Sequence, residues 1–340
     1  MNRETLYQHA RENMKIIVAR LLELSEITHN FSTPPDDIWK NDDDSIMLLC
    51  GRGYYADDMP ETGDRHNRWL ARSANPFNLE RAATVLLYQK IQPFIDALVE
   101  KAFTETNNFR QIDARWIHKN PQYLPVLMHA LGIFSKRDLQ RRLGRATASD
   151  TKISEPTGKK IAGLFKDIDS GSIPRPVQIT ERIKATTEGI VRDLVGRLLL
   201  EDFVASALKK ENIPFKREKE YESLSGVVYD LRADFIIPDP NSPMAFIEVR
   251  RSSSGHASLY AKDKMFSAIN WKGRHKDCLG IIVVDGPWTG ATLDIMSRVF
   301  DYVVPIKRAY EVAQKIRSYL DGDKSVLRWL IQFKIEEHKY

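Results

Sequence analysis

Three residues in the C-terminal half have the types and spacing that metal-dependent chemistry requires: Asp234, Glu248 and Arg250. Both acids interrupt segments of apolar β-forming residues. Two neighbouring carboxylates repel each other, and burying them without a cation is costly. Mg²⁺ is held by one or two carboxylates and water, and it commonly completes its shell with substrate phosphate. The alternative is a structural pair, neutralised by Arg250 or Arg251 and by a backbone amide.

Two predicted strands carry these acids, Ala233 to Ile237 and Met244 to Val249, joined by a link rich in turn residues. We expect an antiparallel pair. If Asp234 faces Glu248, the midpoint of the pairing falls at Asn241, inside the link. Period-two alternation then places the acids and Arg250 on one face. The opposite face carries apolar side chains: Ala233, Phe235, Ile237, Ala245, Ile247 and Val249.

The sequence around these strands resembles the PD-(D/E)XK nuclease superfamily, best known from type II restriction endonucleases. The resemblance rests on an acid-bearing helix, the strand with Asp234, the strand with Glu248-Val249-Arg250 and a following helix, within residues 186–316. It implies catalytic roles for Asp234, Glu248 and Arg250, with Mg²⁺ held by the two acids. Family members often carry a glutamate on the preceding helix, and Glu201 matches that place. The alternative for Glu201 is a solvated helix residue.

The last position of the motif departs from the family pattern, because Arg250 stands where lysine is usual. Arginine stays protonated and cannot act as a base, but it can hold the scissile phosphate. Lys262 or Lys264 on the next helix is an alternative source of the ammonium group. His256, Tyr260 and Lys264 lie four residues apart on one face of that helix and are candidates to support the site. The alternative for this trio is a structural role.

Apolar periodicity predicts a mainly α N-terminal domain and an α/β C-terminal domain with a mixed sheet flanked by helices, as in restriction endonucleases. Pro174 and Pro176 suggest the boundary, giving domains 1–175 and 176–340. The segment 31–72 is expected to be irregular, with Asp42, Asp43 and Asp44 in a solvated loop. Beyond the hairpin we expect strands at 279–284 and 302–306, and helices at 292–300, 308–320 and 325–333.

The segment 131–145 resembles a helix-turn-helix. A helix is expected to end at Gly132, and Ser135 with Asp138 looks like an N-cap pair that opens a second helix. An exposed basic helix of this kind can enter the major groove and contact guanine edges and phosphates. The alternative is a helical hairpin with a solvated basic face. The candidate DNA-binding residues are Arg137, Gln140, Arg141 and Arg145.

Composition sets broad limits on the function. The chain has 340 residues, 42% of them hydrophobic, which is enough for two domains. Its 51 basic and 46 acidic residues are compatible with DNA binding but do not require it. No apolar run reaches the roughly 18 residues of a membrane span. We therefore expect no membrane partner and a soluble intracellular protein, and the resemblance to restriction endonucleases implies the cytoplasm of a prokaryote. Cys50 and Cys278 are expected to be free thiols.

Together these features predict a Mg²⁺-dependent type II restriction endonuclease. As part of a restriction-modification system it would cut double-stranded DNA at a specific sequence, and a palindromic site would require a homodimer. One alternative is a DNA-binding protein with a nuclease-like fold and no catalysis. Another is a repair or structure-specific nuclease, which would share the site but produce no discrete fragments.

Overall fold

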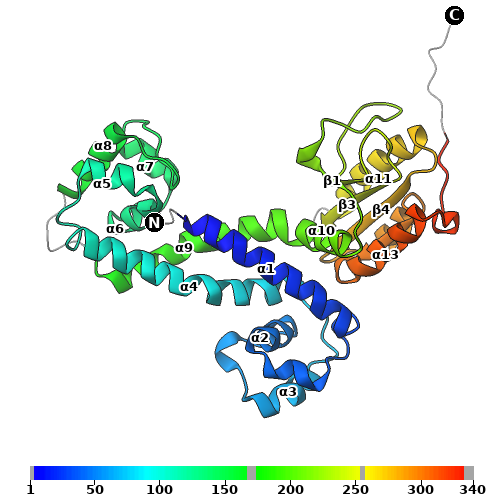
Figure 1. The fold of residues 1–340 in the computed structure, drawn as a ribbon, viewed down its shortest axis with the longest axis horizontal. Helices are drawn as coiled ribbons and strands as arrows, with labels where there is room; N and C mark the ends of the chain where they lie inside the picture. The colour runs from blue at the N-terminus through cyan, green and yellow to red at the C-terminus, as the bar shows by residue number, and fades with distance from the viewer. Residues whose placement is uncertain (1–3, 167–173, 253–256, 333–340) are drawn as a thin grey trace, which may run out of the picture. The chain divides into compact units, whose positions relative to one another are not determined.

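The computed structural model describes residues 4–166, 174–252 and 257–332 (Figure 1). These ranges contain thirteen α-helices and five strands. Two compact units can be distinguished: unit 1 comprises Met1–Ile17 with Trp39–Arg197, and unit 2 comprises Val18–Ile38 with Leu198–Tyr340. The first nine helices are α1 (Leu6–Ile27), α2 (Asp42–Gly51), α3 (Arg65–Ala71), α4 (Leu79–Glu105), α5 (Ala114–Lys119), α6 (Leu124–Ala130), α7 (Lys136–Arg142), α8 (Glu155–Lys166) and α9 (Pro176–Leu194).

Unit 1 is helical, in agreement with the sequence pattern. The side chain of Asn78 caps α4 by accepting a hydrogen bond from Arg81 N, and α4 continues through Pro93 as one helix. Buried side chains follow one face of α4, which packs against α2, α6 and α9. Burial of this apolar face is the main source of stability for such helices.

The expectation of a solvated acidic loop at Asp42 to Asp44 was wrong, because these residues form the first turn of α2. Asn41 caps the helix by accepting a hydrogen bond from Asp44 N. Negative side chains are favourable at a helix N-terminus, where the backbone amides are unpaired. Two of the acids also form ion pairs: Asp42 with Arg65 at 2.7 Å and Asp43 with Lys90 at 2.6 Å.

The division of the chain differs from the expected boundary at residues 175 and 176. Helix α9 belongs to unit 1, where it packs against α4 and α6. The segment Val18–Ile38 belongs to unit 2, where Ser25 Oγ donates a hydrogen bond to Lys307 O at 2.6 Å. The boundaries therefore fall within α1, between Ile38 and Trp39, and within the π-helical turn Val195–Leu199, and not at the prolines.

Unit 2 contains a five-stranded mixed sheet in the order β1-β2-β3-β4-β5. The strands are β1 (Lys216–Arg217), β2 (Phe235–Ile237), β3 (Ala245–Arg251), β4 (Leu279–Asp285) and β5 (Tyr302–Pro305). Strands β1 to β3 pair antiparallel, and β3 to β5 pair parallel. The helices are α10 (Leu200–Lys210), α11 (Ala257–Arg274), α12 (Gly290–Met296) and α13 (Ala309–Leu320). A mixed α/β C-terminal region was predicted from the sequence.

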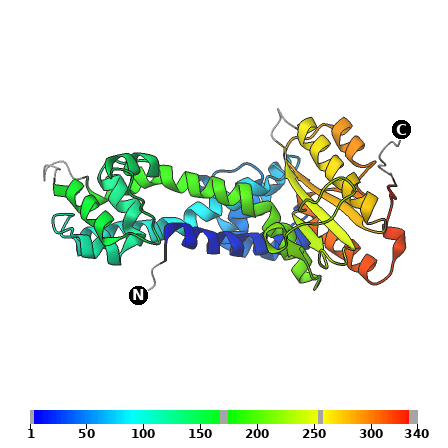
Figure 2. The same cartoon turned by 90° about the horizontal axis from the view of Figure 1, so that it is seen from above.

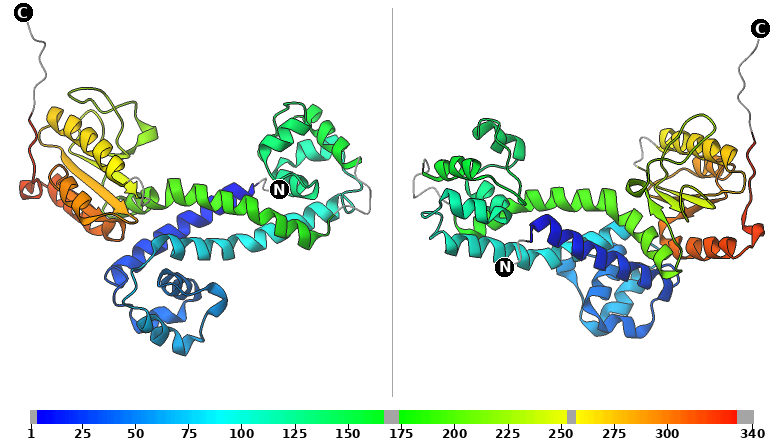
Figure 3. Two further views of the ribbon diagram at one scale, coloured as in Figure 1. Left: turned by 180° about the vertical axis from the view of Figure 1, so that it is seen from behind. Right: turned by 45° about the horizontal axis from the view of Figure 1, so that its top comes forward.

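Helices cover both faces of the sheet (Figures 2 and 3). On one face, Trp271 of α11 and Met296 of α12 pack with Ile236 and Phe246 of the sheet. Helix α13 lies on the opposite face, where it contacts α10. The sequence predicted Ala233 on the face that carries Phe235 and Ile237. Instead it packs with Ile236 and Phe246, because it precedes β2 and regular alternation starts only at Phe235. Both cysteines are free and buried.

The prediction of a helix at 325–333 was wrong for the part of this range that the structure describes. A short 3₁₀ turn, Lys324–Val326, is followed by non-helical chain to residue 332. The cause is Asp301, whose Oδ1 accepts hydrogen bonds from Arg328 N and Trp329 N, both at 2.8 Å. Its Oδ2 accepts from Gly280 N at 2.7 Å and pairs with the ammonium group of Lys272. Both members of this ion pair are fully buried.

We predict that Lys272→Met lowers the free energy of unfolding of unit 2 by about 3 kcal/mol, because removing one partner leaves a buried carboxylate without its cation. Urea unfolding followed by circular dichroism measures the loss. Lys276→Met, at an exposed position just beyond α11, is the matched control and is expected to change stability by less than about 0.5 kcal/mol. Equal stability of the two variants would contradict the prediction.

Candidate active site

The hairpin formed by β2 and β3 brings Asp234 and Glu248 together. Its register pairs Phe235 with Ile247 and Ile237 with Ala245, so the predicted centre at Asn241 is confirmed. Asp234 lies immediately before β2, and the same register continues to place it opposite Glu248. The amide N of Val249 donates a hydrogen bond to Asp234 Oδ2 at 2.7 Å. This bond links the two acid-bearing segments. It involves only Oδ2 of Asp234 and not the second carboxylate oxygen, Oδ1.

Glu248 is fully buried in β3. Its Oε2 accepts a hydrogen bond from Lys264 Nζ at 2.5 Å, whereas its Oε1 has no hydrogen-bond partner. Burial raises the pKa of Glu248 well above its ordinary value, and the charge of Asp234 raises it further, although Lys264 opposes both effects. An unpartnered buried carboxylate oxygen is unusual in a folded protein and calls for an explanation.

Lys264 comes from α11 and is the lysine that reaches the carboxylates, whereas Lys262 is exposed. Burial lowers the pKa of Lys264, but Glu248 and Asp234 more than offset this, so that its pKa is raised overall. Its side chain therefore remains an ammonium ion at neutral pH. Of the two alternatives, Lys262 and Lys264, it is Lys264 whose ammonium group contacts the buried acid.

Arg250 lies two residues beyond Glu248 on β3, and its guanidinium carbon is 4.5 Å from the centre of the Tyr260 ring on α11. This cation–π contact fixes the direction of a half-buried arginine. Its Nε is buried and has no hydrogen-bond partner. Arg250 and Tyr260 thus join Lys264 at the end of the hairpin where the two acids lie. His256, the remaining member of the predicted trio, lies outside the described residues.

Glu201 in the first turn of α10 is half-buried and is electrostatically coupled to Asp234. Burial raises the pKa of Glu201 to about 7, the charge of Asp234 adds to the increase, and Arg217 opposes it. Arg217 in turn forms an ion pair with Asp202 at 2.6 Å. The structure therefore places the helix glutamate near the hairpin acids as an acid that titrates close to neutrality.

Tyr221 was not identified from the sequence. Its hydroxyl accepts a hydrogen bond from Ala233 N at 2.6 Å and donates one to Ala233 O at 2.8 Å. It therefore holds the backbone of the residue before Asp234, where regular strand pairing has not begun. Because this contact spans 12 residues of irregular chain, no local sequence pattern could have indicated it.

The residues predicted to bind DNA lie in unit 1. Helices α6 and α7 are joined by a turn in which Gly132 has a φ of 66°, and Ser135 Oγ caps α7 by accepting a hydrogen bond from Asp138 N. Leu139 and Leu143 are buried, and four polar side chains are exposed: Arg137, Gln140, Arg141 and Arg145. Helix α7 ends at Arg142, and Arg145 follows it in the chain, close to the helix as the sequence predicted.

The hairpin residues fit a hard cation, although the described residues contain no group of three His, Cys, Asp or Glu side chains arranged to bind a metal. The fit depends on Glu248 Oε1, a buried acceptor without a partner, and on Asp234 beside it. Two carboxylates with water and substrate oxygens are a typical ligand set for Mg²⁺. Asp234 and Glu248 are thus the residues that would hold the ion.

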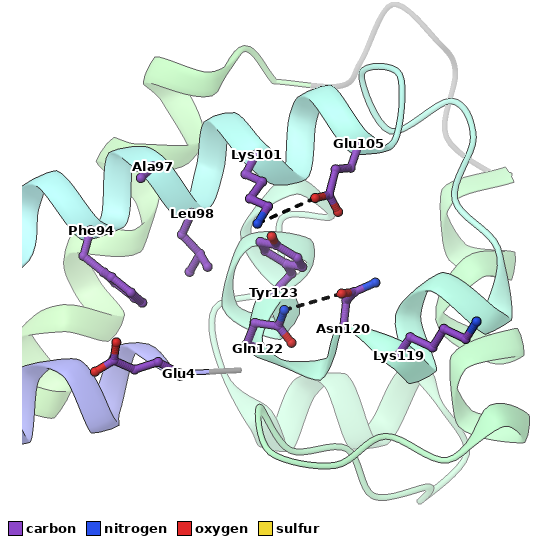
Figure 4. A pocket seen from close by; sticks show the side chains of 10 residues that line it. All are labelled: Glu4, Phe94, Ala97, Leu98, Lys101, Glu105, Lys119, Asn120, Gln122 and Tyr123. Atoms are coloured by element: carbon purple, nitrogen blue, oxygen red, sulfur yellow. Dashed lines mark hydrogen bonds and ion pairs between the residues drawn. The ribbon is translucent and has the colours of Figure 1, made fainter. Parts of the chain in front are cut away.

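Unit 1 contains a separate pocket of about 540 Å³ (Figure 4). Phe94, Leu98 and Tyr123 form its apolar part. Lys101 and Glu105 lie on its rim and pair with each other at 3.9 Å. Burial raises the pKa of Tyr123 to about 12, so its phenol remains neutral. Unlike the Lys264–Glu248 pair, whose acid is fully buried, the Lys101–Glu105 pair is partly exposed on both sides. No helix in the described ranges has the length and apolar character needed to cross a bilayer.

We predict that wild-type stability falls relative to Glu201→Gln as pH rises from about 4.5 to about 7 without metal. The folded chain binds the Glu201 proton more tightly than the unfolded chain, so unfolding releases a proton in this range. Allowing for solvent screening at a half-buried group, the difference at pH 8 is about 1 kcal/mol in favour of the variant. Urea unfolding at pH 5 and pH 8 measures it, and a difference independent of pH would contradict the assignment.

Comparisons with family models, with curated proteins and with solved structures found no match to this chain. What can be inferred about its chemistry therefore comes from the residues and their geometry: two acids, an ammonium ion and a guanidinium ion gathered at one end of a β-hairpin.

Proposed function

We propose that the protein is a Mg²⁺-dependent endonuclease that hydrolyses phosphodiester bonds in double-stranded DNA, of the type II restriction kind. One observation carries the proposal: the ammonium group of Lys264 lies against the fully buried Glu248, beside Asp234. Two acids with one amine at the end of a hairpin are the combination that the PD-(D/E)XK resemblance implies. Here the amine comes from α11 instead of from the motif position.

The two acids hold the metal in this proposal. When bound, Mg²⁺ supplies an activated water and a Lewis acid for the phosphate. The Val249 amide fixes one oxygen of Asp234, and the Asp234 carboxylate interacts electrostatically with Glu248. Tyr221 restrains the backbone at Ala233 and limits the movement of Asp234. Glu201, with a pKa near 7, can accept a proton from water or orient it at neutral pH.

The two cations act on the phosphate. Lys264 remains protonated, so it stabilises the negative charge that develops during attack and does not serve as the base. Arg250 offers a planar guanidinium group that can bind two phosphate oxygens at once. Tyr260 holds that group by its cation–π contact. Each cation therefore has a distinct role: Arg250 holds the position where the family usually has lysine, and Lys264 supplies the ammonium group from α11.

Helix α7 is the proposed recognition element in unit 1. Its exposed arginines and Gln140 have the chemistry needed to contact guanine edges, adenine edges and phosphates. Recognition of a palindromic sequence would then involve a homodimer. A restriction-modification role and a prokaryotic source are parts of the same proposal.

A second candidate is a DNA-binding protein with the same fold and no catalysis. It is favoured by the ion pair between Glu248 and Lys264, which already neutralises one acid without metal, and by the absence of the usual lysine at Arg250. A repair or structure-specific nuclease would share the site of the main proposal. Cleavage assays separate these three functions.

Plasmid and phage DNA incubated with the purified full chain test the proposal. We expect discrete fragments with Mg²⁺, no cleavage with EDTA, and no cleavage by Asp234→Ala, because that variant lacks one of the two metal-binding carboxylates. Sequencing of the fragment ends would give the cut site. DNA binding without cleavage on many substrates would favour the catalytically inactive protein, and cleavage without discrete fragments would favour the structure-specific nuclease.

We predict that Lys264→Gln lowers the cleavage rate about a hundredfold or more, because it removes the charge that stabilises the transition state. Single-turnover cleavage assays measure the rate. Lys276→Gln, which replaces an exposed lysine just beyond α11, is the matched control and should keep the wild-type rate. Far-ultraviolet circular dichroism checks that both variants fold. An undiminished rate in a folded Lys264→Gln would remove Lys264 from the mechanism.

A further inference from the structure

Helix α11 has two functional faces. Its inner face carries Lys264 toward Glu248 and packs Ala261, Ala268 and Trp271 into the core of unit 2. Its outer face carries four exposed residues, which we name the α11 stripe: Leu259, Lys262, Asp263 and Phe266. Lys262 and Asp263 are adjacent, and one apolar residue lies about one turn away on each side of them. The two apolar ends of the stripe are unusually open, Leu259 being 62% and Phe266 47% exposed.

The apolar surface continues beyond the helix. The ring of Tyr229 lies 5.5 Å from that of Phe266, measured between centroids. Next to Tyr229, the side chain of Val228 is 47% exposed, and Leu231 in the same loop is 39% exposed. The backbone N of Val228 donates to Asn270 Oδ1 at 2.7 Å, which anchors this loop to α11. A cluster of several exposed apolar side chains on one surface indicates an interaction site, whereas single ones do not.

The order of residues in the stripe is self-complementary. When two such helices lie antiparallel about a two-fold axis between positions 262 and 263, Lys262 faces the partner's Asp263 and Leu259 faces the partner's Phe266. Two ion pairs then occupy the centre, and an apolar contact lies on each side. A two-fold interface requires this property, because the same surface meets itself.

We propose that the α11 stripe and the loop around Tyr229 form the homodimer interface of this protein, with a second copy of the chain as the partner. The central charges favour the antiparallel register over a shifted one, since a shift would place an apolar end against a charge. The proposal is independent of the nuclease assignment. The same helix would contact the partner with its outer face and Glu248 with its inner face.

Charge exchange across the two-fold axis tests the proposal in sedimentation experiments on the full chain without DNA. Wild type is expected to dimerise reversibly. Lys262→Asp places two acids opposite each other, and Asp263→Lys places two lysines opposite each other. Each variant alone is therefore expected to dimerise about tenfold more weakly, because two ion pairs become two like-charge pairs.

Two rescues make the result specific. The double variant Lys262→Asp with Asp263→Lys should regain wild-type dimerisation. An equimolar mixture of the two single variants should form heterodimers, because each chain then meets opposite charges. Failure to fold could not produce either rescue. A wild type that stays monomeric at all accessible concentrations, or a dimer that neither exchange weakens, would overturn the proposal.

An apolar substitution provides a second measurement. Leu259→Glu is expected to abolish dimerisation, since it places a carboxylate against the partner's Phe266. Ile295→Glu is the matched control, because Ile295 is an exposed apolar residue of α12 in the same unit, 49% exposed and outside the stripe. Equal loss of dimer in both variants, or in neither, would contradict the assigned surface.

Discussion

The ion pair between Lys264 and the fully buried Glu248 is the interaction on which the site depends. A carboxylate with no exposed surface cannot remain charged without a nearby cation. In this protein the cation is the ammonium group of Lys264 on α11. This requirement ties β3 to α11 and fixes which face of the helix points inward. It also leaves one oxygen of Glu248 unsatisfied beside Asp234. Burying Glu248 in β3 therefore carries a desolvation cost that an apolar residue at this position would not have.

The hairpin was predictable from sequence because its determinants are local. The link between the strands is rich in turn formers, and pairing Asp234 with Glu248 places the centre of the hairpin inside that link at Asn241, so the register follows from local features. The spacing of four residues also placed Tyr260 and Lys264 on one helix face. What the pattern left open was the choice between Lys262 and Lys264, since that depends on the direction in which α11 packs on the sheet.

Other features depend on distant contacts and were beyond the reach of sequence patterns. The hydroxyl of Tyr221 meets Ala233 only because the chain between them folds back. Prolines suggested a boundary at Pro174 and Pro176, yet α9 stays with unit 1 because its packing partners are there. The helix expected at 325–333 is absent from its described part because the backbone amides of Arg328 and Trp329 donate to Asp301 instead of to helix carbonyls. In each case a long-range partner outweighed local propensity.

The two buried thiols have a practical consequence. Burial raises the pKa of Cys50 to about 11 and that of Cys278 to about 12. Thiolates, not thiols, react with maleimides and oxidants, so the native chain gives little background in such reactions. Cysteines introduced at exposed positions, one in each unit, could therefore carry a pair of fluorescent dyes without first removing the native ones. Energy transfer between the dyes would measure the distance between unit 1 and unit 2 in solution.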